Sequence, residues 1–392
     1  MFALVDCNNF FVSCERAVNP GLNGTPVIVL SGGDGCVVAM SNEAKAVGIT
    51  RGIPMFRIRD IVKRHGVVAI RGHHRLYKET SLRVMAVLSS LVEKIEIYSI
   101  DEAFLHIPPS TGDMAGFGRY VAAEVMRLTS IPVSVGLAPT KTLAKIAAGF
   151  AKKYSGYRGA CLMDTGEKRI RALSLTPIGK VWGIGPRLSV RLGKNGITTA
   201  LDFASMPRAS VAAIVSVAGE RTWRELNGEP CIEHEYVPPE RRSISSTATF
   251  DHDVTDFDRL RSALADHVAT AASRMRRKAM HAGEISVFIQ TNRYKPHLPQ
   301  TSDTARFTFD PPTADTLALT AAAAALLGQI YKKGFAYKRS GVTLDHLVGD
   351  DKVQHGLFED IGEVERRRRL METLDRLNST PGTISLGSQG RN

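Results

Sequence analysis

The 392-residue sequence lacks the features that mark membrane and secreted proteins. No apolar stretch approaches the ~20 residues that a membrane-spanning helix needs. The first ten residues contain no basic segment followed by a long apolar run, so we expect no secretion signal. The five cysteines are scattered and none stands in a CxxC pair, which predicts neither a disulfide framework nor a cysteine zinc site. We therefore expect a protein of the reducing cytoplasm without a membrane partner.

Acidic residues are in the minority, with 39 Asp and Glu against 51 Lys and Arg, a formal net charge of +12. A surplus of this size favours a polyanionic partner such as nucleic acid, because each neutralised phosphate releases a counterion. The composition fits a merely basic soluble enzyme equally well. The length exceeds one ordinary hydrophobic core and predicts two to four domains.

The N-terminal half reads as a mixture of strands and helices. Residues 2–5, 26–30 and 36–40 form short apolar runs typical of strands, and residues 10–17 have helical spacing. A further helix is predicted over residues 80–94, followed by strand-like segments at 95–107 and 131–135. These elements predict an α+β fold.

The C-terminal half has a different organisation. Residues 166–233 are rich in short helical patterns with glycine turns, and the proline- and arginine-containing segment 236–242 resembles a linker. Beyond the linker, the apolar periodicity predicts five alternating strands and helices, at 243–250, 257–278, 283–291, 313–331 and 341–347. From Gly349 onward the chain is polar, and we expect a loosely ordered tail.

Three carboxylates follow apolar runs. Asp6 closes the first strand, and Asp101 and Glu102 are expected to close another that begins at Ile95. Three carboxylates at strand ends on one sheet edge suit a site for two Mg²⁺ ions and phosphoryl transfer. Adjacent residues of a regular strand face opposite sides, so Asp101 and Glu102 share a site only if the strand breaks there. The alternative is that both are solvated residues of a hairpin.

Five motifs stand in a fixed order along the chain. They occupy residues 6–11 (DCNNFF), 38–45 (VAMSNEAK), 48–54 (GITRGIP), 98–104 (YSIDEAF) and 135–145 (VGLAPTKTLAK). Their order and spacing resemble those of the Y-family DNA polymerases, and within that family the UmuC-type branch, the catalytic subunits of bacterial DNA polymerase V. The similarity runs from Met1 to about Gly390.

The resemblance implies a right-hand polymerase, an α+β multidomain fold. It implies a palm (1–19 and 76–165), small fingers (20–75), a helical thumb (166–235), a linker (236–242), an α/β little finger (243–348) and a tail (349–392). In the family, Asp6, Asp101 and Glu102 are the catalytic residues. They bind two Mg²⁺ ions together with the backbone carbonyl of Cys7, and Mn²⁺ can substitute.

The family also implies a nucleotide pocket. Phe11 falls at the steric gate that excludes the 2′-hydroxyl of ribose, beside Phe10, and core packing is the alternative for these aromatic residues. Asn42 and Lys45 face the triphosphate, and a helix N-terminus there favours phosphate. Many members carry tyrosine and arginine at these two positions, so we expect weaker phosphate contact here. Lys152 reaches the triphosphate too.

Basic side chains predict contacts with primer-template DNA. Lys141, Lys145 and Lys152 share one face of a helix whose other face is apolar, although a solvated amphipathic helix has the same pattern. Gly183 and Gly185 resemble the hairpin of a helix-hairpin-helix, flanked by Arg187, and would contact phosphates without reading sequence. A plain glycine turn is the alternative. Arg241 and Arg242 lead into the last domain as a further basic pair.

The tail carries a short peptide with Gln354, Leu357 and Phe358, which matches the type that docks polymerases on the sliding clamp. The resemblance further implies a UmuD-like dimer and RecA as partners, but the chain ends earlier than UmuC-type members do. Taken together, we expect an error-prone translesion DNA polymerase that adds dNTPs during the SOS response to DNA damage. The rivals are a nucleotidyl cyclase, which needs no hairpin or second DNA-gripping domain, and a non-catalytic DNA-binding accessory subunit, which needs no carboxylate triad.

Overall fold

The computed structural model describes residues 1–32, 35–233, 242–353 and 361–378. The chain forms two compact units, residues 1–238 and 239–392, and each is described by itself. The linker predicted at 236–242 spans the division between them. In the described ranges no helix has the length and apolar character needed to cross a bilayer.

The first unit is built around a five-stranded sheet of order β5-β6-β1-β7-β8. The central strand β1 pairs antiparallel with β6 on one side and with β7 on the other, and β8 runs parallel to β7. The strands span Phe2–Cys7 (β1), Ile95–Ile97 (β5), Glu102–His106 (β6), Val133–Ala138 (β7) and Ala160–Leu162 (β8). The strand-like segment predicted at 95–107 is thus two strands separated by residues 98–101.

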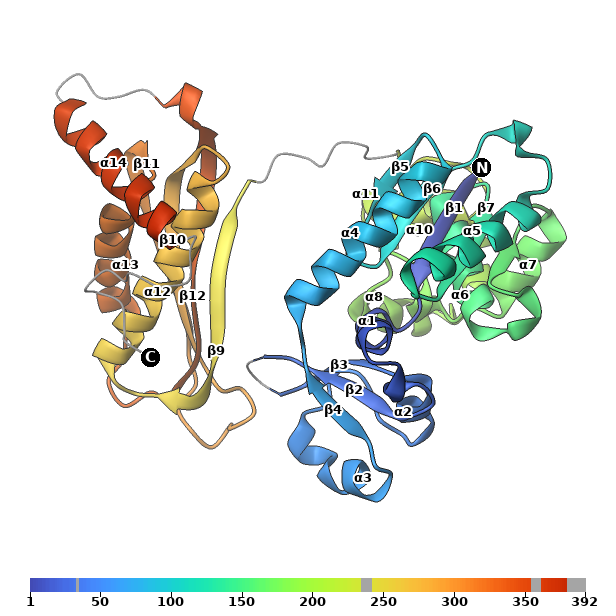
Figure 1. Cartoon of the computed structure of the whole chain (residues 1–392), viewed down its shortest axis with the longest axis horizontal. Helices are drawn as coiled ribbons and strands as arrows, with labels where there is room; N and C mark the ends of the chain where they lie inside the picture. Colours follow the sequence, from blue (N-terminus) through green and yellow to red (C-terminus); the bar gives the residue numbers. More distant parts are fainter. Residues whose placement is uncertain (33–34, 234–241, 354–360, 379–392) are drawn as a thin grey trace. The chain divides into compact units, whose positions relative to one another are not determined.

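Helices cover both faces of this sheet because its inner strands are apolar on both sides. One face packs against α1 (Phe10–Val18), α4 (His74–Leu91) and α5 (Met114–Thr129), which run along the sheet in Figure 1. The other face, which includes Leu4 and Phe104, packs against α6 (Lys141–Lys153) and the short helices that follow it. The end of β1 and the start of β6 therefore lie between two helical layers.

A smaller module interrupts the first unit between α1 and α4. It has a three-stranded sheet of order β3-β2-β4, in which β2 pairs antiparallel with β3 and parallel with β4. Its elements are Val27–Leu30 (β2), Val37–Met40 (β3), Asn42–Ala46 (α2), Arg59–Arg64 (α3) and Val68–Arg71 (β4). It has its own small core around Ile28, Val37 and Ile49, and it falls within residues 20–75.

Short helices complete the first unit, as the sequence predicts. They span Gly166–Ser174 (α7), Pro186–Gly193 (α8), Ala200–Ala204 (α9), Arg208–Ile214 (α10) and Val217–Leu226 (α11). They share a core with α6. Glu225 of α11 is fully buried and accepts hydrogen bonds from the backbone N–H (2.8 Å) and hydroxyl (2.8 Å) of Thr142 at the start of α6. This carboxylate fixes the helical segment to the sheet.

The second unit has a four-stranded antiparallel sheet of order β11-β10-β12-β9, with helices α12 and α13 between its strands in the chain. Its elements are Ile244–Val254 (β9), Phe257–Arg276 (α12), Met280–Thr291 (β10), Ser302–Thr313 (β11), Thr316–Ile330 (α13) and Tyr337–Gly349 (β12). The prediction of three strands missed β11. This strand lies at the edge of the sheet and is largely exposed, so its sequence is too polar to read as a strand.

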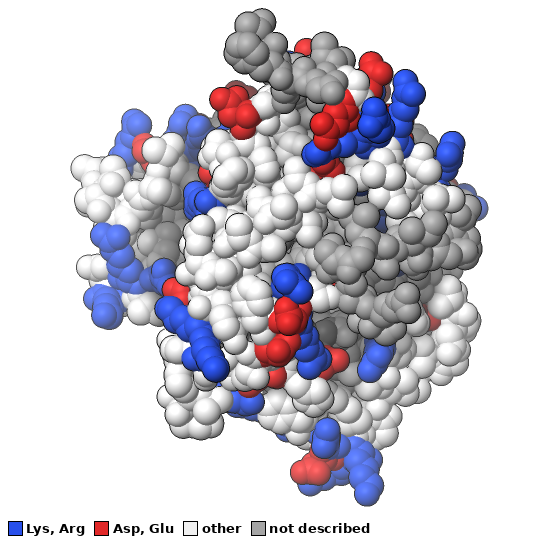
Figure 2. Space-filling model, turned by 90° about the vertical axis from the view of Figure 1, so that its left-hand side faces the viewer, with Lys and Arg blue, Asp and Glu red and all other residues white. Residues whose placement is uncertain are grey.

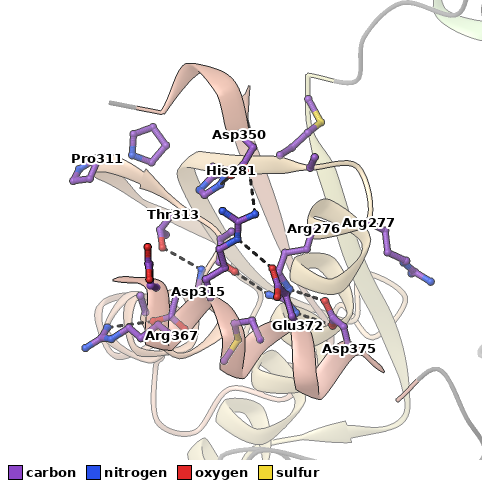
Figure 3. Close-up of a pocket in the computed structure, with 18 residues that line it drawn as sticks. Arg276, Arg277, His281, Pro311, Thr313, Asp315, Asp350, Arg367, Glu372 and Asp375 are labelled. Carbon is purple, nitrogen blue, oxygen red and sulfur yellow. Dashed lines mark hydrogen bonds and ion pairs between the residues drawn. The ribbon is translucent and has the colours of Figure 1, made fainter. Parts of the chain in front are cut away.

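The prediction of a loosely ordered tail from Gly349 is wrong for residues 361–377. These residues form helix α14 (Ile361–Leu377), which carries Met371 into contact with the second unit, where its side chain is buried. Arg276 of α12 donates two hydrogen bonds to Asp375 of α14, at 2.7 and 2.9 Å. Figure 3 shows this pair at one end of a pocket of about 650 Å³ beside α14.

Figure 2 shows side chains of both charges scattered over the face that it presents.

Candidate active site

Asp6 and Glu102 lie directly opposite each other in the β1–β6 pair. Side chains alternate along a strand, so Asp6 projects on the same face as Leu4, and Glu102 on the same face as Phe104. Leu4 and Phe104 pack against α6. The two carboxylates therefore stand at the end of an apolar row and face the same helix.

Asp101 lies in a turn beside these two acids, because β6 begins only at Glu102. The backbone N–H groups of Tyr98 (3.1 Å) and Ser99 (3.0 Å) both donate to the carbonyl of Glu102, which closes a tight turn. The Ser99 hydroxyl donates to Asp101 at 2.7 Å, and the carbonyl of Asp101 accepts from the N–H of Cys7 at 2.9 Å. This turn removes the geometric objection to a shared site for the two adjacent acids.

Two lysines of α6 pair with these acids. The ammonium of Lys152 lies 2.6 Å from Asp6, and that of Lys145 lies 2.6 Å from Glu102. The sequence places both lysines on one helical face and predicts phosphates in front of it. In this structure the same face meets carboxylates, so Lys145 is a member of the carboxylate cluster.

Negative charge is concentrated at this edge. Burial raises the pKa of Glu102 above its ordinary value, Lys145 lowers it in part, and the nearby charges of Asp6 and Asp101 raise it further. Burial likewise raises the pKa of the Cys7 thiol, with Asp101 and Asp6 adding to the effect. The side chain of Cys7 is buried in the core. Only its backbone is therefore available to the site, where its N–H donates to the carbonyl of Asp101.

The carboxylates of Asp6, Asp101 and Glu102 suit a hard divalent cation, because such cations prefer oxygen ligands. A bound cation would also offset the repulsion between these carboxylates. Within the described residues, no three His, Cys, Asp or Glu side chains form a group that could hold a metal ion. In this structure, ammonium groups engage Asp6 and Glu102, and a hydroxyl engages Asp101. A metal ion would have to exchange places with the two ammonium groups.

Lys141 corrects a sequence prediction. Its side chain is 1% exposed and its ammonium pairs with the buried Glu96 of β5 and donates to the carbonyl of Glu233 at 2.6 Å. It also lies over the ring of Phe104. A lysine buried in this way is not available to DNA, and its contribution is to hold α6 on the sheet.

The two phenylalanines after β1 have different environments. Phe10 is buried in the core, which confirms the core-packing alternative for this residue and removes it from the nucleotide pocket. Phe11 is half-buried and its ring stacks on Tyr77 of α4 with the centroids 4.3 Å apart. Only Phe11 remains in a position to meet a nucleotide.

Asn42 and Lys45 lie beside the carboxylates, and a residue that the sequence reading did not single out connects them. The ammonium of Lys45 donates to the side-chain oxygens of Asn9 (2.6 Å) and Asn42 (3.3 Å), and the amide of Asn9 donates to Asn42 (3.1 Å). Burial and the charge of Lys152 lower the pKa of Lys45, while Asp6 raises it in part. Asn9 has a left-handed backbone (φ 47), which asparagine tolerates, and the Asn8-Asn9 pair after a strand was the available signal.

Aromatic residues surround Lys145 on the other side of the cluster. Its ammonium lies 4.6 Å from the centre of the Tyr98 ring and 5.7 Å from that of Trp182. The indole N–H of Trp182 donates to the Tyr98 hydroxyl at 3.0 Å. Trp182 precedes α8, so this contact joins the helical segment to the turn that carries Asp101. Spacing along the chain did not indicate it.

Sequence comparison places these residues in a known family. Residues 5–149 match the model of the impB/mucB/samB family, and residues 241–357 match that of its C-terminal domain. Protein UmuC of Salmonella typhimurium is 38% identical over 395 residues, which cover all of this chain and 94% of that protein. The chain belongs to the UmuC-like Y-family DNA polymerases. With this membership comes its enzyme class, DNA-directed DNA polymerase.

Three more distant relatives or solved structures are also similar to this chain. DNA polymerase IV of Moorella thermoacetica is 29% identical over 97% of this chain and 93% of its own. Among solved structures, a chimera of the Y-family polymerases Dbh and Dpo4 superposes with a TM-score of 0.73 at 23% identity, covering 89% of this chain and all of the other. DinB from Sulfolobus solfataricus gives 0.52 at 23% identity over the same shares. These likenesses confirm the α+β fold with a separate C-terminal sheet domain.

Gly183 and Gly185, the residues of the predicted hairpin, lie just before α8. A 3-10 turn (Ile178–Lys180), in place of a full first helix, precedes it. Gly183 has φ 84, a left-handed backbone conformation that favours glycine. A Cβ there would also lie only 2.9 Å from the Thr222 hydroxyl, which is a second reason for glycine at this position. Gly185 is open to solvent, and Arg187 and Arg242 are exposed. Arg241 and the predicted clamp peptide with Gln354, Leu357 and Phe358 lie outside the described residues.

Proposed function

We propose that this Y-family polymerase adds deoxynucleotides to a primer 3′-hydroxyl opposite damaged template bases, by two-metal phosphoryl transfer. One observation carries the proposal: Asp6 of β1 and Glu102 of β6 lie opposite each other, Asp101 stands in the turn just before Glu102, and Lys145 and Lys152 pair with Glu102 and Asp6. A cyclase or an accessory subunit would not need this edge together with a basic hairpin and a second sheet domain.

In this proposal Asp6, Asp101, Glu102 and the carbonyl of Cys7 hold two Mg²⁺ ions, for which Mn²⁺ can substitute. When bound, such ions lower the pKa of the attacking 3′-hydroxyl and stabilise the charge on the leaving pyrophosphate. Ser99 holds Asp101 in the turn by its 2.7 Å hydrogen bond. Lys145 and Lys152 balance the acids until the cations arrive, and Lys152 is then free to meet the triphosphate.

The incoming dNTP would lie between the sheet edge and the three-stranded module. Lys45, oriented by Asn9 and Asn42, supplies one mobile positive charge toward its phosphates. The half-buried ring of Phe11 would lie under the sugar and exclude a 2′-hydroxyl. Because the module has only three short strands and a small core, it would enclose the nascent base pair loosely and admit damaged templates.

We assign the palm to the five-stranded sheet with α1, α4, α5 and α6, the fingers to the three-stranded module, the thumb to the segment from α7 to α11, and the little finger to the second unit. Gly183, Gly185 and Arg187 would grip phosphates of the primer-template duplex, and Arg241 and Arg242 would add charge at the start of the little finger. Such contacts position DNA of any sequence.

The biological setting is the SOS response in the cytoplasm, at the chromosome. We propose that Gln354, Leu357 and Phe358 dock on the sliding clamp and that a UmuD-like dimer and RecA assist. The proposal rests on the UmuC-like membership of the chain and on the presence of five free thiols, which suits a reducing compartment.

Primer extension tests the proposal. Purified protein with Mg²⁺ and dNTPs should extend a primer on an undamaged template and past an abasic site, in the presence of clamp and partner proteins if not alone. DNA binding without any extension under all these conditions would favour an accessory subunit.

A further inference from the structure

The ring of Phe11 rests on a second aromatic ring that no solvent reaches. Phe11 and Tyr77 stack with an interplanar angle of 12° and centroids 4.3 Å apart. Tyr77 is 0% exposed, whereas Phe11 is half-buried. The position of the Phe11 ring is therefore set from below by a residue that cannot itself touch a nucleotide.

Tyr77 is fixed in turn by a buried carboxylate. Its hydroxyl donates to Glu15 at 2.7 Å, and the same oxygen of Glu15 lies 2.9 Å from Nδ1 of His73. Glu15 is 5% exposed and stands one helical turn after Phe11 in α1. Burial and the hydrogen bond to Glu15 raise the pKa of Tyr77, so the phenol remains a donor at physiological pH.

This hydrogen-bonded group lies where the chain leaves and re-enters the palm sheet. Glu15 is near the end of α1, which leads into the three-stranded module, and His73 is the residue before α4, where the chain returns. Gly72, next to His73, leaves a Cβ position only 3.7 Å from the Tyr77 ring and 3.3 Å from the carbonyl of Leu30. The Glu15 carboxylate thus links α1, which carries Phe11, to the two places where the chain enters and leaves the three-stranded module.

We propose that Glu15 and Tyr77 are positioning residues for sugar discrimination, holding the Phe11 ring at the height where a 2′-hydroxyl collides with it. The inference rests on the proposed function and deepens it. Neither residue touches substrate; both act through Phe11. If the Phe11 ring could move away from the sugar by a fraction of an ångström, the 2′-hydroxyl of an rNTP would fit. The Tyr77 ring, whose hydroxyl is held by Glu15, prevents that movement.

The chemistry of the pair predicts which changes matter. Tyr77→Phe keeps the stacked ring but removes the hydroxyl, which leaves the buried Glu15 carboxylate short of a donor. Glu15→Gln keeps the shape and removes the charge, which weakens the bond to Tyr77. Loss of one hydrogen bond to a charged partner corresponds to roughly tenfold in an equilibrium. We expect each variant to lower the preference for dNTP over rNTP by about threefold to tenfold.

The test is single-nucleotide insertion with Mg²⁺, comparing kcat/KM for a dNTP and for the matching rNTP on the same primer-template. Phe11→Ala serves as the reference for a removed gate. The double variant Phe11→Ala with Tyr77→Phe should discriminate no less than Phe11→Ala alone, because Tyr77 acts through that ring. A general loss of stability would lower both rates and leave their ratio unchanged, so the ratio separates positioning from folding.

Matched controls come from α5. Tyr120→Phe makes the same chemical change at an exposed position, and Glu124→Gln makes it at a partly buried position paired with Arg127 of the same helix, so both should keep the wild-type ratio. If Tyr77→Phe fails to fold, Glu15→Gln still tests the proposal with the tyrosine in place.

The possible results are distinct. Reduced discrimination in Tyr77→Phe and Glu15→Gln, with both controls unchanged, supports the proposal. If Phe11→Ala loses discrimination while both positioning variants keep it, the inference is wrong and the proposed function stands. If Phe11→Ala also keeps it, Phe11 is not the gate and the inference fails with it. Wild-type protein that extends no primer would overturn the proposed function and this inference together.

Discussion

The ammonium of Lys145 and the carboxylate of Glu102 form an ion pair of 2.6 Å at the sheet edge where Asp6 and Asp101 also lie. Both side chains are largely buried, and the rings of Tyr98 and Trp182 flank the lysine. A cation held there competes with any metal ion for the same oxygens.

Removing this internal cation should tighten metal binding in the absence of substrate. We predict that Lys145→Gln lowers the dissociation constant of Mn²⁺, read from free Mn²⁺ by electron paramagnetic resonance, by about threefold to tenfold, since an opposite charge nearby stabilises the metal-free carboxylate. Lys153→Gln changes a lysine of the same helix that pairs with no acid in the described contacts, and should leave the value unchanged. Equal or weaker Mn²⁺ binding in Lys145→Gln would show that the lysine does not compete.

Lys141 should matter for stability. Lys141→Met leaves the buried charge of Glu96 without its ammonium partner, and we expect a loss of about 3–5 kcal/mol in the free energy of unfolding. The double variant Lys141→Met with Glu96→Gln should recover part of it, because the buried charge is gone. Denaturant unfolding measures both. If the Lys141→Met protein were as stable as the wild type but bound DNA more weakly, the result would support the DNA contact that the sequence predicts for Lys141.

The two glycines of the hairpin can be separated by alanine substitution. Gly183→Ala forces a side chain into a left-handed backbone and against Thr222, and should cost about 1–3 kcal/mol in stability. Gly185→Ala, which meets nothing within 4 Å, should leave the melting temperature unchanged.

The DNA affinities of these two alanine variants distinguish a hairpin that binds phosphate from a turn with a purely structural role. If phosphate approaches the hairpin backbone, Gly185→Ala should weaken binding of a primer-template in a fluorescence anisotropy titration. Unchanged affinity in Gly185→Ala would leave this segment as a structural turn only.

Helix α14 should detach when its arginine pair is broken. Asp375→Asn removes the charge that accepts two hydrogen bonds from Arg276, a contact worth about 1.5–3 kcal/mol. We expect faster amide hydrogen exchange across 361–377. Glu372→Gln breaks only the exposed pair with Arg368 within the helix and should change exchange little. Equal exchange in both variants would show that the Arg276 pair does not hold the helix.

Much of the fold and the core of the site could be predicted from the sequence, for physical reasons. The apolar run before Asp6 indicates a strand end, and the family motifs place Asp101 and Glu102 at the same edge, although Glu102 begins a strand and does not close one. Periodicity could not show the turn at Ser99 that lets adjacent acids share a site, because the turn depends on hydrogen bonds between side chain and backbone.

The failures have a common cause, which is that a pattern shows which residues share a face but not what the face meets. The lysine face of α6 suggested phosphates, yet Lys141 meets Glu96 in the core. Strand β11 and helix α14 are polar because one is an exposed edge and the other is held by charge pairs to Arg276 and Asp315. The apolar residues that recur in them, at 305, 307 and 309 in β11 and at 370, 371, 374 and 377 in α14, stand among polar neighbours and were overlooked.

The most direct test of the central claim is primer extension by the Asp101→Ala protein. With Mg²⁺, dNTPs and an undamaged primer-template, we predict a loss of at least about 10³-fold in kcat/KM relative to wild type, since electrostatic contributions of this kind dominate such catalysis. Asp258→Ala, a change at an exposed aspartate of α12, should retain wild-type activity. Extension by Asp101→Ala at the wild-type rate would contradict the proposed chemistry.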